Sequence, residues 1–167
     1  MSPQDPAPPD GQAWDLLVVG GGTAGIVGAK TAASLGASVL LVERERTGGD
    51  CLWTGCVPSK ALLAAAHAVA DARGAARYGI HVQGIEVDFT AVLASVHAAI
   101  AAIAPADSAE ALRASGVRVV KGTARLTGPH TAEIDHLPVR WRQVLLATGA
   151  APSSPPVPGI TGPAFYT

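Results

Sequence analysis

The apolar positions near the start of the chain fall into short continuous runs. Residues 14–20 (WDLLVVG) and 38–43 (SVLLVE) are mostly apolar and end in glycine or glutamate, a pattern typical of buried strands in a parallel sheet. Residues 23–35, between these runs, are rich in alanine and predict a helix. Strand, helix and strand in this order predict a βαβ unit.

Two longer alanine-rich segments follow this unit. Residues 58–76 and 88–104 both have a helix-forming composition, and the larger apolar side chains of the second recur at helical spacing. Pro105 ends the second helix, and Asp107 with Glu110 three residues later predicts a capping box for a shorter helix. We expect the two long helices to pack as an antiparallel hairpin, with their alanines forming a core between them.

The pattern changes again after the short helix. Residues 117–120 (VRVV) predict a third core strand. Residues 122–147 consist of short alternating segments separated by two proline-containing turns, which predicts a small antiparallel β-meander. Residues 144–148 (VLLAT) predict a last buried strand. The whole pattern indicates an α/β fold.

The two ends of the chain differ from the rest. Residues 1–13 carry four prolines and no apolar periodicity, and we interpret them as a disordered tail. Residues 151–167 carry five prolines and are interpreted as a linker. The folded domain is therefore predicted to span residues 14–150.

Composition narrows the class of protein further. The 167 residues are 49% hydrophobic and 15% charged, but 33 of them are alanine. We therefore expect no segment with the roughly 20 strongly apolar residues that cross a bilayer. A net charge of −1 offers no basic surface to nucleic acid or to an anionic membrane. Two cysteines exclude a disulfide-rich secreted fold, and the N-terminus has no signal-peptide pattern. These features predict a cytoplasmic protein.

A glycine-rich pattern joins the first predicted strand to the first predicted helix. Gly20, Gly22 and Gly25 match G-x-G-x-x-G, with Thr23 and Ala24 opening the helix. The first glycine permits a tight turn, the second lets the backbone approach a pyrophosphate, and the third lets helix and strand pack closely. The helix N-terminus then directs N–H groups and a positive dipole at the phosphates. The alternative is an ordinary glycine-rich turn.

Glu43 lies 18 residues after Gly25, at the end of the second predicted strand. A carboxylate at this position can accept hydrogen bonds from both hydroxyls of an adenosine ribose, and it repels a 2′-phosphate. We therefore predict that the loop holds NAD or FAD rather than NADP. The neighbouring Arg44 and Arg46 are interpreted as part of a solvated turn.

The two cysteines stand in a C-x4-C pattern without the further ligands of a metal site. On a regular helix, Cα atoms five residues apart are about 8.7 Å from each other, farther than the roughly 7 Å that a disulfide spans. Cys51 and Cys56 can therefore join only if the backbone is distorted between them, most easily at Gly55. Proximity to a helix start at Pro58 and to Lys60 favours a thiolate at Cys56. The alternative is a pair of buried, unpaired cysteines.

These motifs together carry a family resemblance. The sequences GGGTAG, GGDCLWTGCVPSK and the ATG triplet at 147–149 resemble the FAD-binding part of the pyridine nucleotide–disulfide oxidoreductases. Residues 103–126 are most similar to the mercuric reductase-like branch. The resemblance implies a Rossmann-like FAD-binding domain with a helical hairpin and a small β-meander.

The resemblance also implies which residues hold FAD. The pyrophosphate would lie on the glycine loop, the ribose on Glu43, the flavin side of the cofactor along the start of the cysteine motif, and the adenine beside the third predicted strand. The implied set is Gly20, Gly22, Thr23, Ala24, Gly25, Glu43, Gly49, Asp50, Lys60, Gly122, Ala124, Ala147, Thr148 and Gly149.

The same resemblance implies a redox role for the cysteine motif. Cys56 would be the thiol next to the flavin, Cys51 the thiol that exchanges with substrate, and Lys60 a residue near the flavin N5. Electrons would pass from NAD(P)H through FAD to a Cys51–Cys56 disulfide. From there they would reach a small-molecule, thiol or disulfide, or metal-ion substrate, as in mercuric reductase or dihydrolipoamide dehydrogenase.

The chain departs from the family in two residues and in length. Asp50 stands where many members have threonine, and Trp53 where many have asparagine. The family continues into an NAD(P)-binding and a dimerisation domain, so the resemblance implies the N-terminal part of a homodimeric enzyme, inactive alone. The alternatives are a stand-alone flavin- or nucleotide-binding module without turnover, and a different NAD-binding enzyme that uses only the glycine loop.

Overall fold

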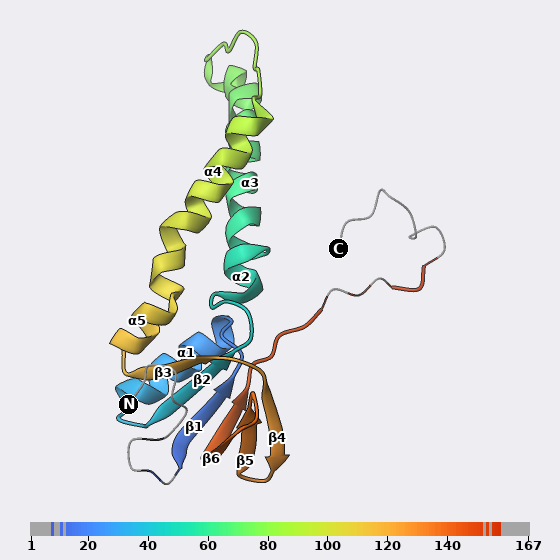
Figure 1. Cartoon of the computed structure of the whole chain (residues 1–167). Helices are drawn as coiled ribbons and strands as arrows, with labels where there is room; N and C mark the ends of the chain where they lie inside the picture. Colours follow the sequence, from blue (N-terminus) through green and yellow to red (C-terminus); the bar gives the residue numbers. More distant parts are fainter. Residues whose placement is uncertain (1–7, 9–10, 12, 152, 154, 158–167) are drawn as a thin grey trace.

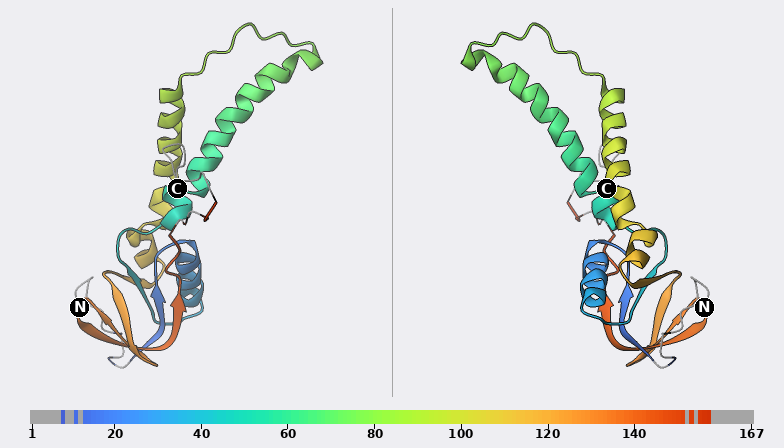
Figure 2. Two further views of the ribbon diagram at one scale, coloured as in Figure 1. Left: turned by 90° about the vertical axis from the view of Figure 1, so that its right-hand side faces the viewer. Right: turned by 90° about the vertical axis from the view of Figure 1, so that its left-hand side faces the viewer.

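A computed structural model describes residues 8, 11, 13–151, 153 and 155–157 of the chain. Most of the predicted tail and linker lies outside the described residues. The described part consists of a mixed β-sheet at one end and a helical hairpin that extends away from it (Figures 1 and 2). This arrangement confirms the predicted α/β fold, with a Rossmann-like unit, a helical hairpin and an antiparallel meander.

The sheet contains six strands in the order β3-β2-β1-β6-β5-β4. Strands β3, β2, β1 and β6 run parallel, and β4, β5 and the first part of β6 form the antiparallel meander. The strands are β1 (Trp14–Val19), β2 (Val39–Glu43), β3 (Val117–Lys121), β4 (Ala124–Gly128), β5 (Thr131–Ile134) and β6 (Leu137–Leu146). Helix α1 (Thr23–Ser34) connects β1 to β2 and completes the predicted βαβ unit.

Successive side chains of the central strands point to opposite faces of the sheet, and each face builds its own core. On one face, α1 and α5 (Ala109–Ala114) cover a cluster that includes Val18 and Leu41. On the other face, Leu17 and Leu40 pack against apolar residues of β5 and β6. Both faces of the parallel strands are therefore buried, which explains their continuous apolar runs.

The remaining helices form the hairpin and its base. They are α2 (Gly49–Trp53), α3 (Cys56–Gly74), the 3₁₀ helix η1 (Ala75–Tyr78), α4 (Phe89–Ile103) and the 3₁₀ helix η2 (Ala104–Asp107). Helices α3 and α4 contact each other, as predicted. The predicted core between them is wrong: none of the residues of α3 is buried, and within α4 only Val96 is. Alanine side chains are small, and the hairpin stands away from the sheet, so its outer faces stay exposed (Figure 2).

Two local predictions also need correction. Ser108, not Asp107, caps α5, and its hydroxyl accepts a hydrogen bond from the Ala111 N–H at 3.1 Å. Asp107 instead ends η2, whose first turn contains Pro105. The last strand predicted at 144–148 is not separate: residues 144–146 are the end of the ten-residue β6, residues 147–148 lie beyond it, and Leu146 is 61% exposed.

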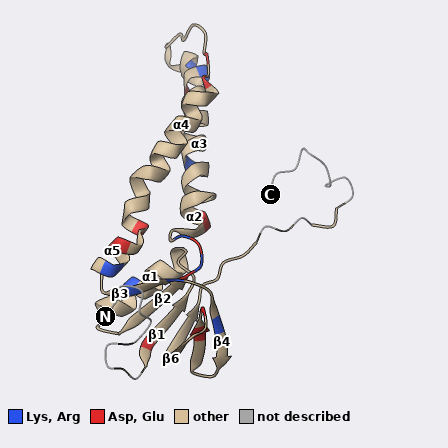
Figure 3. Cartoon of the chain, viewed as in Figure 1, with Lys and Arg blue, Asp and Glu red and all other residues tan. Residues whose placement is uncertain are grey.

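The prediction that no segment is apolar enough to cross a membrane is wrong by composition alone. The helical stretch Phe89–Ala114, 26 residues long, passes that test by length and composition alone. Figure 3 shows how few charged residues the upper part of α4 carries. A single segment of this kind is weak support for a membrane span, and this one is interrupted by the η2 turn and ends against β3.

Candidate functional site: a dinucleotide cavity beside a cysteine pair

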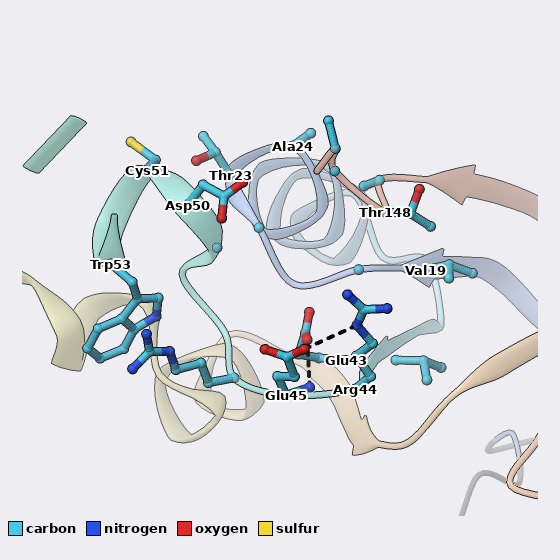
Figure 4. Close-up of a pocket in the computed structure, with 18 of the residues that line it drawn as sticks. Val19, Thr23, Ala24, Glu43, Arg44, Glu45, Asp50, Cys51, Trp53 and Thr148 are labelled. Carbon is cyan, nitrogen blue, oxygen red and sulfur yellow. Dashed lines mark hydrogen bonds and ion pairs between the residues drawn. The ribbon is translucent and has the colours of Figure 1, made fainter. Parts of the chain in front are cut away.

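A cavity of about 640 Å³ opens at the carboxyl ends of β1, β2 and β6 (Figure 4). This is where open parallel sheets bind their ligands. The cavity brings together thirteen of the residues that the sequence assigned to cofactor or redox chemistry: Gly20, Gly22, Thr23, Ala24, Glu43, Gly49, Asp50, Cys51, Gly122, Ala124, Ala147, Thr148 and Gly149. Gly25, Cys56 and Lys60 do not line it.

The glycine loop has the shape that its sequence predicts. Gly20 has a φ angle of +106°, and an added Cβ would overlap the carbonyl group of Ala147, the residue after β6. A Cβ on Gly25 would overlap the carbonyl oxygen of Gly20, so the third glycine acts in packing, beneath the cavity. Gly22 is the N-cap of α1 and offers no side-chain cap. The first N–H groups of the helix are therefore oriented to receive an anion from the cavity.

Glu43 ties the glycine loop to the end of β2. Its Oε2 accepts a hydrogen bond from the Gly21 N–H at 2.6 Å, and its Oε1 accepts one from the Glu45 N–H at 2.8 Å. These two bonds fix the orientation of the carboxylate at the cavity wall. An ionised carboxylate has further lone pairs, so each oxygen can still accept a hydrogen bond from a ribose hydroxyl.

Residues that follow β3 and β6 complete the wall of the cavity. The Gly122 N–H donates to the Glu43 carbonyl at 2.9 Å, which brings the residues after β3 beside β2. The Ala147 N–H donates to the Val19 carbonyl at 2.9 Å, which brings the ATG triplet beside the glycine loop. Segments far apart in the sequence therefore meet around one ligand-sized space.

Helix α2, which was not predicted from the sequence, carries Cys51 to the edge of this cavity. The Gly48 N–H donates to the Gly21 carbonyl at 2.8 Å, so the start of α2 lies on the glycine loop. At its other end, the Trp53 indole N–H donates to the Thr47 carbonyl at 2.8 Å. A five-residue helix is too short to have shown a helical repeat in the sequence.

The charged residues after β2 also line the cavity, although they were interpreted only as a solvated turn. The Arg46 guanidinium lies over the Trp53 ring, 3.9 Å from its centroid, and Arg44 pairs with Glu45. All three charged side chains are exposed, so the solvated interpretation holds in part. Their position at a strand end next to the glycine loop was the signal that could have placed them at the cavity.

The backbone is broken between the two cysteines, as the C-x4-C spacing requires. Helix α2 ends at Trp53 and α3 begins at Cys56, with Gly55 between them at φ −111° and ψ −104°. This confirms the predicted distortion at Gly55. Both thiols are free, and Cys51 is half-buried while Cys56 is exposed.

The expected stabilisation of a Cys56 thiolate is wrong in direction. The neighbouring Cys51 sulfur, which shares a hydrogen bond with the Cys56 thiol, raises the pKa of Cys56, and desolvation raises it further. The Lys60 ammonium lowers the pKa, but by less. The helix start and Lys60 are visible in the sequence, whereas Cys51 comes close to Cys56 only because the backbone is broken at Gly55.

The site therefore defines a dinucleotide-binding α/β domain with a dithiol at the edge of its cavity. An anion-binding helix start, a glycine cradle that a Cβ would fill and a carboxylate held at a strand end fit FAD, the cofactor predicted from the sequence. Within the described ranges, no three His, Cys, Asp or Glu residues are grouped so that they could hold a metal ion.

Comparison with known proteins agrees with this class. The family model of the pyridine nucleotide-disulphide oxidoreductases matches residues 14–167, and the chain belongs to that family. It is 35% identical to a dihydrolipoyl dehydrogenase of Chlamydia pneumoniae, and the match covers 89% of this chain and 32% of that protein. It is 35% identical to a glutathione reductase of Burkholderia cepacia, with 87% and 32% covered. It is 34% identical to a mercuric reductase of Streptomyces lividans, with 88% and 32% covered.

These relatives confirm the predicted family and its cofactors. Members such as the dihydrolipoyl dehydrogenases and glutathione reductases are FAD enzymes that use NAD(P)H. The chain spans about a third of the length of these relatives. The chain is 34–35% identical to each of the three relatives, so these percentages do not favour the mercuric reductase-like branch over the others.

Proposed function

We propose that this chain is the FAD-binding part of an NAD(P)H-dependent disulfide oxidoreductase. The observation that carries the proposal is the cavity itself, which gathers the glycine loop, Glu43 and Cys51 in one place. FAD supplies two-electron transfer between a nicotinamide and a dithiol. NAD(P)H would be the electron source of the complete enzyme.

Different residues of the cavity would bind different parts of the cofactor. The N–H groups at the start of α1 would hold the pyrophosphate, and the Glu43 carboxylate, already oriented by two backbone N–H groups, would hold the adenosine ribose. The segment from Gly122 to Ala124 would border the adenine. The ATG triplet would close the wall nearest the glycine loop.

The cysteine pair would carry the thiol chemistry. The Cys51 thiolate attacks one sulfur of a disulfide substrate, forms a mixed disulfide and releases the first thiol product. The Cys56 thiolate then attacks the Cys51 sulfur, closes the Cys51–Cys56 disulfide and releases the second product. The pair loses the two electrons that the substrate disulfide gains, and the two leaving thiolates take up protons. The break at Gly55 between α2 and α3 and the effect of Cys51 on the pKa of Cys56 support the ability of the two thiols to join.

The roles of the two thiols follow the family resemblance, with Cys56 and Lys60 on the flavin side. In the structure, Cys51 lines the cavity and Cys56 does not, so the assignment needs a direct test. The substrate would be a small thiol or disulfide, or a metal ion held by the dithiol. The complete protein would be a cytoplasmic homodimer, and the exposed apolar side chains of α3 and α4 support an interface there.

The test is a flavin titration followed by anaerobic reduction. We expect the purified chain to retain FAD after removal of free cofactor. On reduction, a long-wavelength absorption band from a thiolate against the flavin should survive in Cys51→Ser and disappear in Cys56→Ser. The reverse pattern would exchange the two roles. A chain that binds no FAD would contradict the proposal.

A second candidate is a flavin-binding module without turnover, and it is favoured by the position of Cys56 and Lys60, which do not line the cavity. The same experiment separates the two. A module would bind FAD but show no oxidation of NADH or NADPH and no thiol-dependent band.

A further inference from the structure

The cofactor cavity carries more negative than positive charge. Its lining includes the carboxylates of Glu43, Glu45 and Asp50 and the guanidinium groups of Arg44 and Arg46. A dinucleotide adds the negative charges of its diphosphate to this set. The charge that the diphosphate meets therefore depends on which of the five groups are already paired.

Both guanidinium groups are engaged within the protein. The Arg44 Nε lies 3.5 Å from the Glu45 Oε1, and the Arg46 guanidinium lies over the Trp53 ring. Arg44 and Glu45 therefore offset each other, and Arg46 is held toward α2. Neither cation is placed to neutralise a second carboxylate.

Among the three described carboxylates of the cavity, Asp50 has neither a cation partner nor a backbone N–H group bound to its side chain. Among the described residues, its closest polar side-chain contact is the Thr54 hydroxyl, 3.5 Å from Oδ1. Glu43, in contrast, is held by two backbone N–H groups. Asp50 is exposed to solvent at the cavity, so its charge is available to whatever enters.

Asp50 also lies near the anion-binding end of the cavity. The residue before it, Gly49, packs so closely on the backbone of Gly22 that a Cβ on Gly49 would come 2.7 Å from the Gly22 Cα. Figure 4 shows Asp50 and Thr23 at the same end of the cavity. Gly22 and Thr23 begin α1, whose positive end is the pyrophosphate site. A negative charge beside that end reduces the positive potential that an anion would meet.

We propose that Asp50 sets the preference of the cavity among cofactors by charge. Its carboxylate opposes the diphosphate at the start of α1 and lowers the affinity for FAD, without lowering the affinity for an uncharged flavin. Threonine or asparagine at this position would remove the repulsion. The proposal rests on the proposed FAD site and goes beyond it by assigning a determinant of affinity.

The experiment measures the binding of FAD, ADP and riboflavin to the whole apoprotein and to Asp50→Asn. We expect the variant to bind FAD and ADP about tenfold more tightly, from removal of a like charge close to the phosphates, and riboflavin with unchanged affinity. Raising the salt concentration should strengthen FAD binding to the unaltered chain and narrow the difference. Asp50→Thr should reproduce the gain.

The matched control is Asp71→Asn, which removes the same charge from an exposed position on α3 away from the cavity. It should change none of the three affinities. Equal FAD affinity in the unaltered chain and Asp50→Asn would overturn the charge proposal and leave the FAD site intact. Weaker binding of both FAD and riboflavin would overturn it in favour of Asp50 as a hydrogen-bond acceptor for the cofactor. No FAD binding by either form would remove the proposed function as well.

Discussion

The sheet and the helical hairpin are built from similarly apolar sequence but bury it very differently. Leu17 and Leu40 in the sheet are fully buried, whereas Leu63 on α3 is 55% exposed and Phe89 on α4 is 61% exposed. The sheet is covered on both faces by elements of its own chain. The hairpin covers only one side of each helix. The difference shows that apolar content does not build a core unless a second layer lies opposite.

The functional site lies at the boundary between these two regions. The sheet provides the glycine loop and Glu43, while α2, at the base of the hairpin, carries Cys51, and Cys56 is the first residue of the hairpin itself. The cofactor-binding half of the site is thus held by a packed core. The dithiol half depends on an element with little burial.

The largest expected effect comes from shortening one leucine in the sheet and one in the hairpin. We expect Leu17→Ala, a fully buried position, to lower the free energy of unfolding by about 2–5 kcal/mol because it opens a cavity in the core. Leu63→Ala on the hairpin should cost less than about 0.5 kcal/mol, because the side chain is already mostly in water. Urea denaturation followed by circular dichroism measures both. Equal costs would show that the hairpin is buried in solution.

A smaller effect on stability is expected from a glycine substitution in the loop at the cavity. Gly25→Ala places a Cβ against the Gly20 carbonyl, so we expect a loss of about 1–3 kcal/mol in unfolding free energy from overpacking and weaker FAD binding. The control is Gly74→Ala at the end of α3, where the nearest atom to an added Cβ is 4.0 Å away. It should be neutral or stabilising by up to about 1 kcal/mol. A Gly25→Ala protein with unchanged stability and FAD affinity would contradict the described loop.

The smallest effect concerns the first residue of the hairpin. The pKa of Cys56 is raised, so its thiolate forms only at higher pH than in an ordinary cysteine. The protonated thiol is favoured in the folded state, so its stabilising contribution is present at lower pH and is lost as pH rises through the raised pKa. In Cys51→Ala the pKa of Cys56 should fall, so the rise in its alkylation rate with increasing pH should begin at a lower pH than in the unaltered chain. Mass spectrometry across a pH series measures this rate. An unchanged profile would show that Cys51 does not perturb Cys56.

Much of the fold follows from local patterns in the sequence. The apolar runs at 14–20 and 38–43 and the helix between them appear where predicted, because a buried parallel strand requires a continuous apolar run. The break at Gly55 was predicted from covalent reach alone. The short helix α2 was not predicted, because five residues show no helical period. Strand β6 was predicted as two separate segments, because its first part pairs with β5 and its later part with β1.

The sequence by itself determined the βαβ unit, the glycine loop and the acid at the end of β2, since each depends on residues near one another in the chain. Only the tertiary structure decided which residues share the cavity, how exposed the hairpin is and in which direction the pKa of Cys56 moves. Those properties depend on contacts between segments distant in sequence and on how much water each side chain keeps. Asp50 shows the distinction: its sequence position indicates an unusual charge, but only the packing of Gly49 on Gly22 places that charge beside the start of α1.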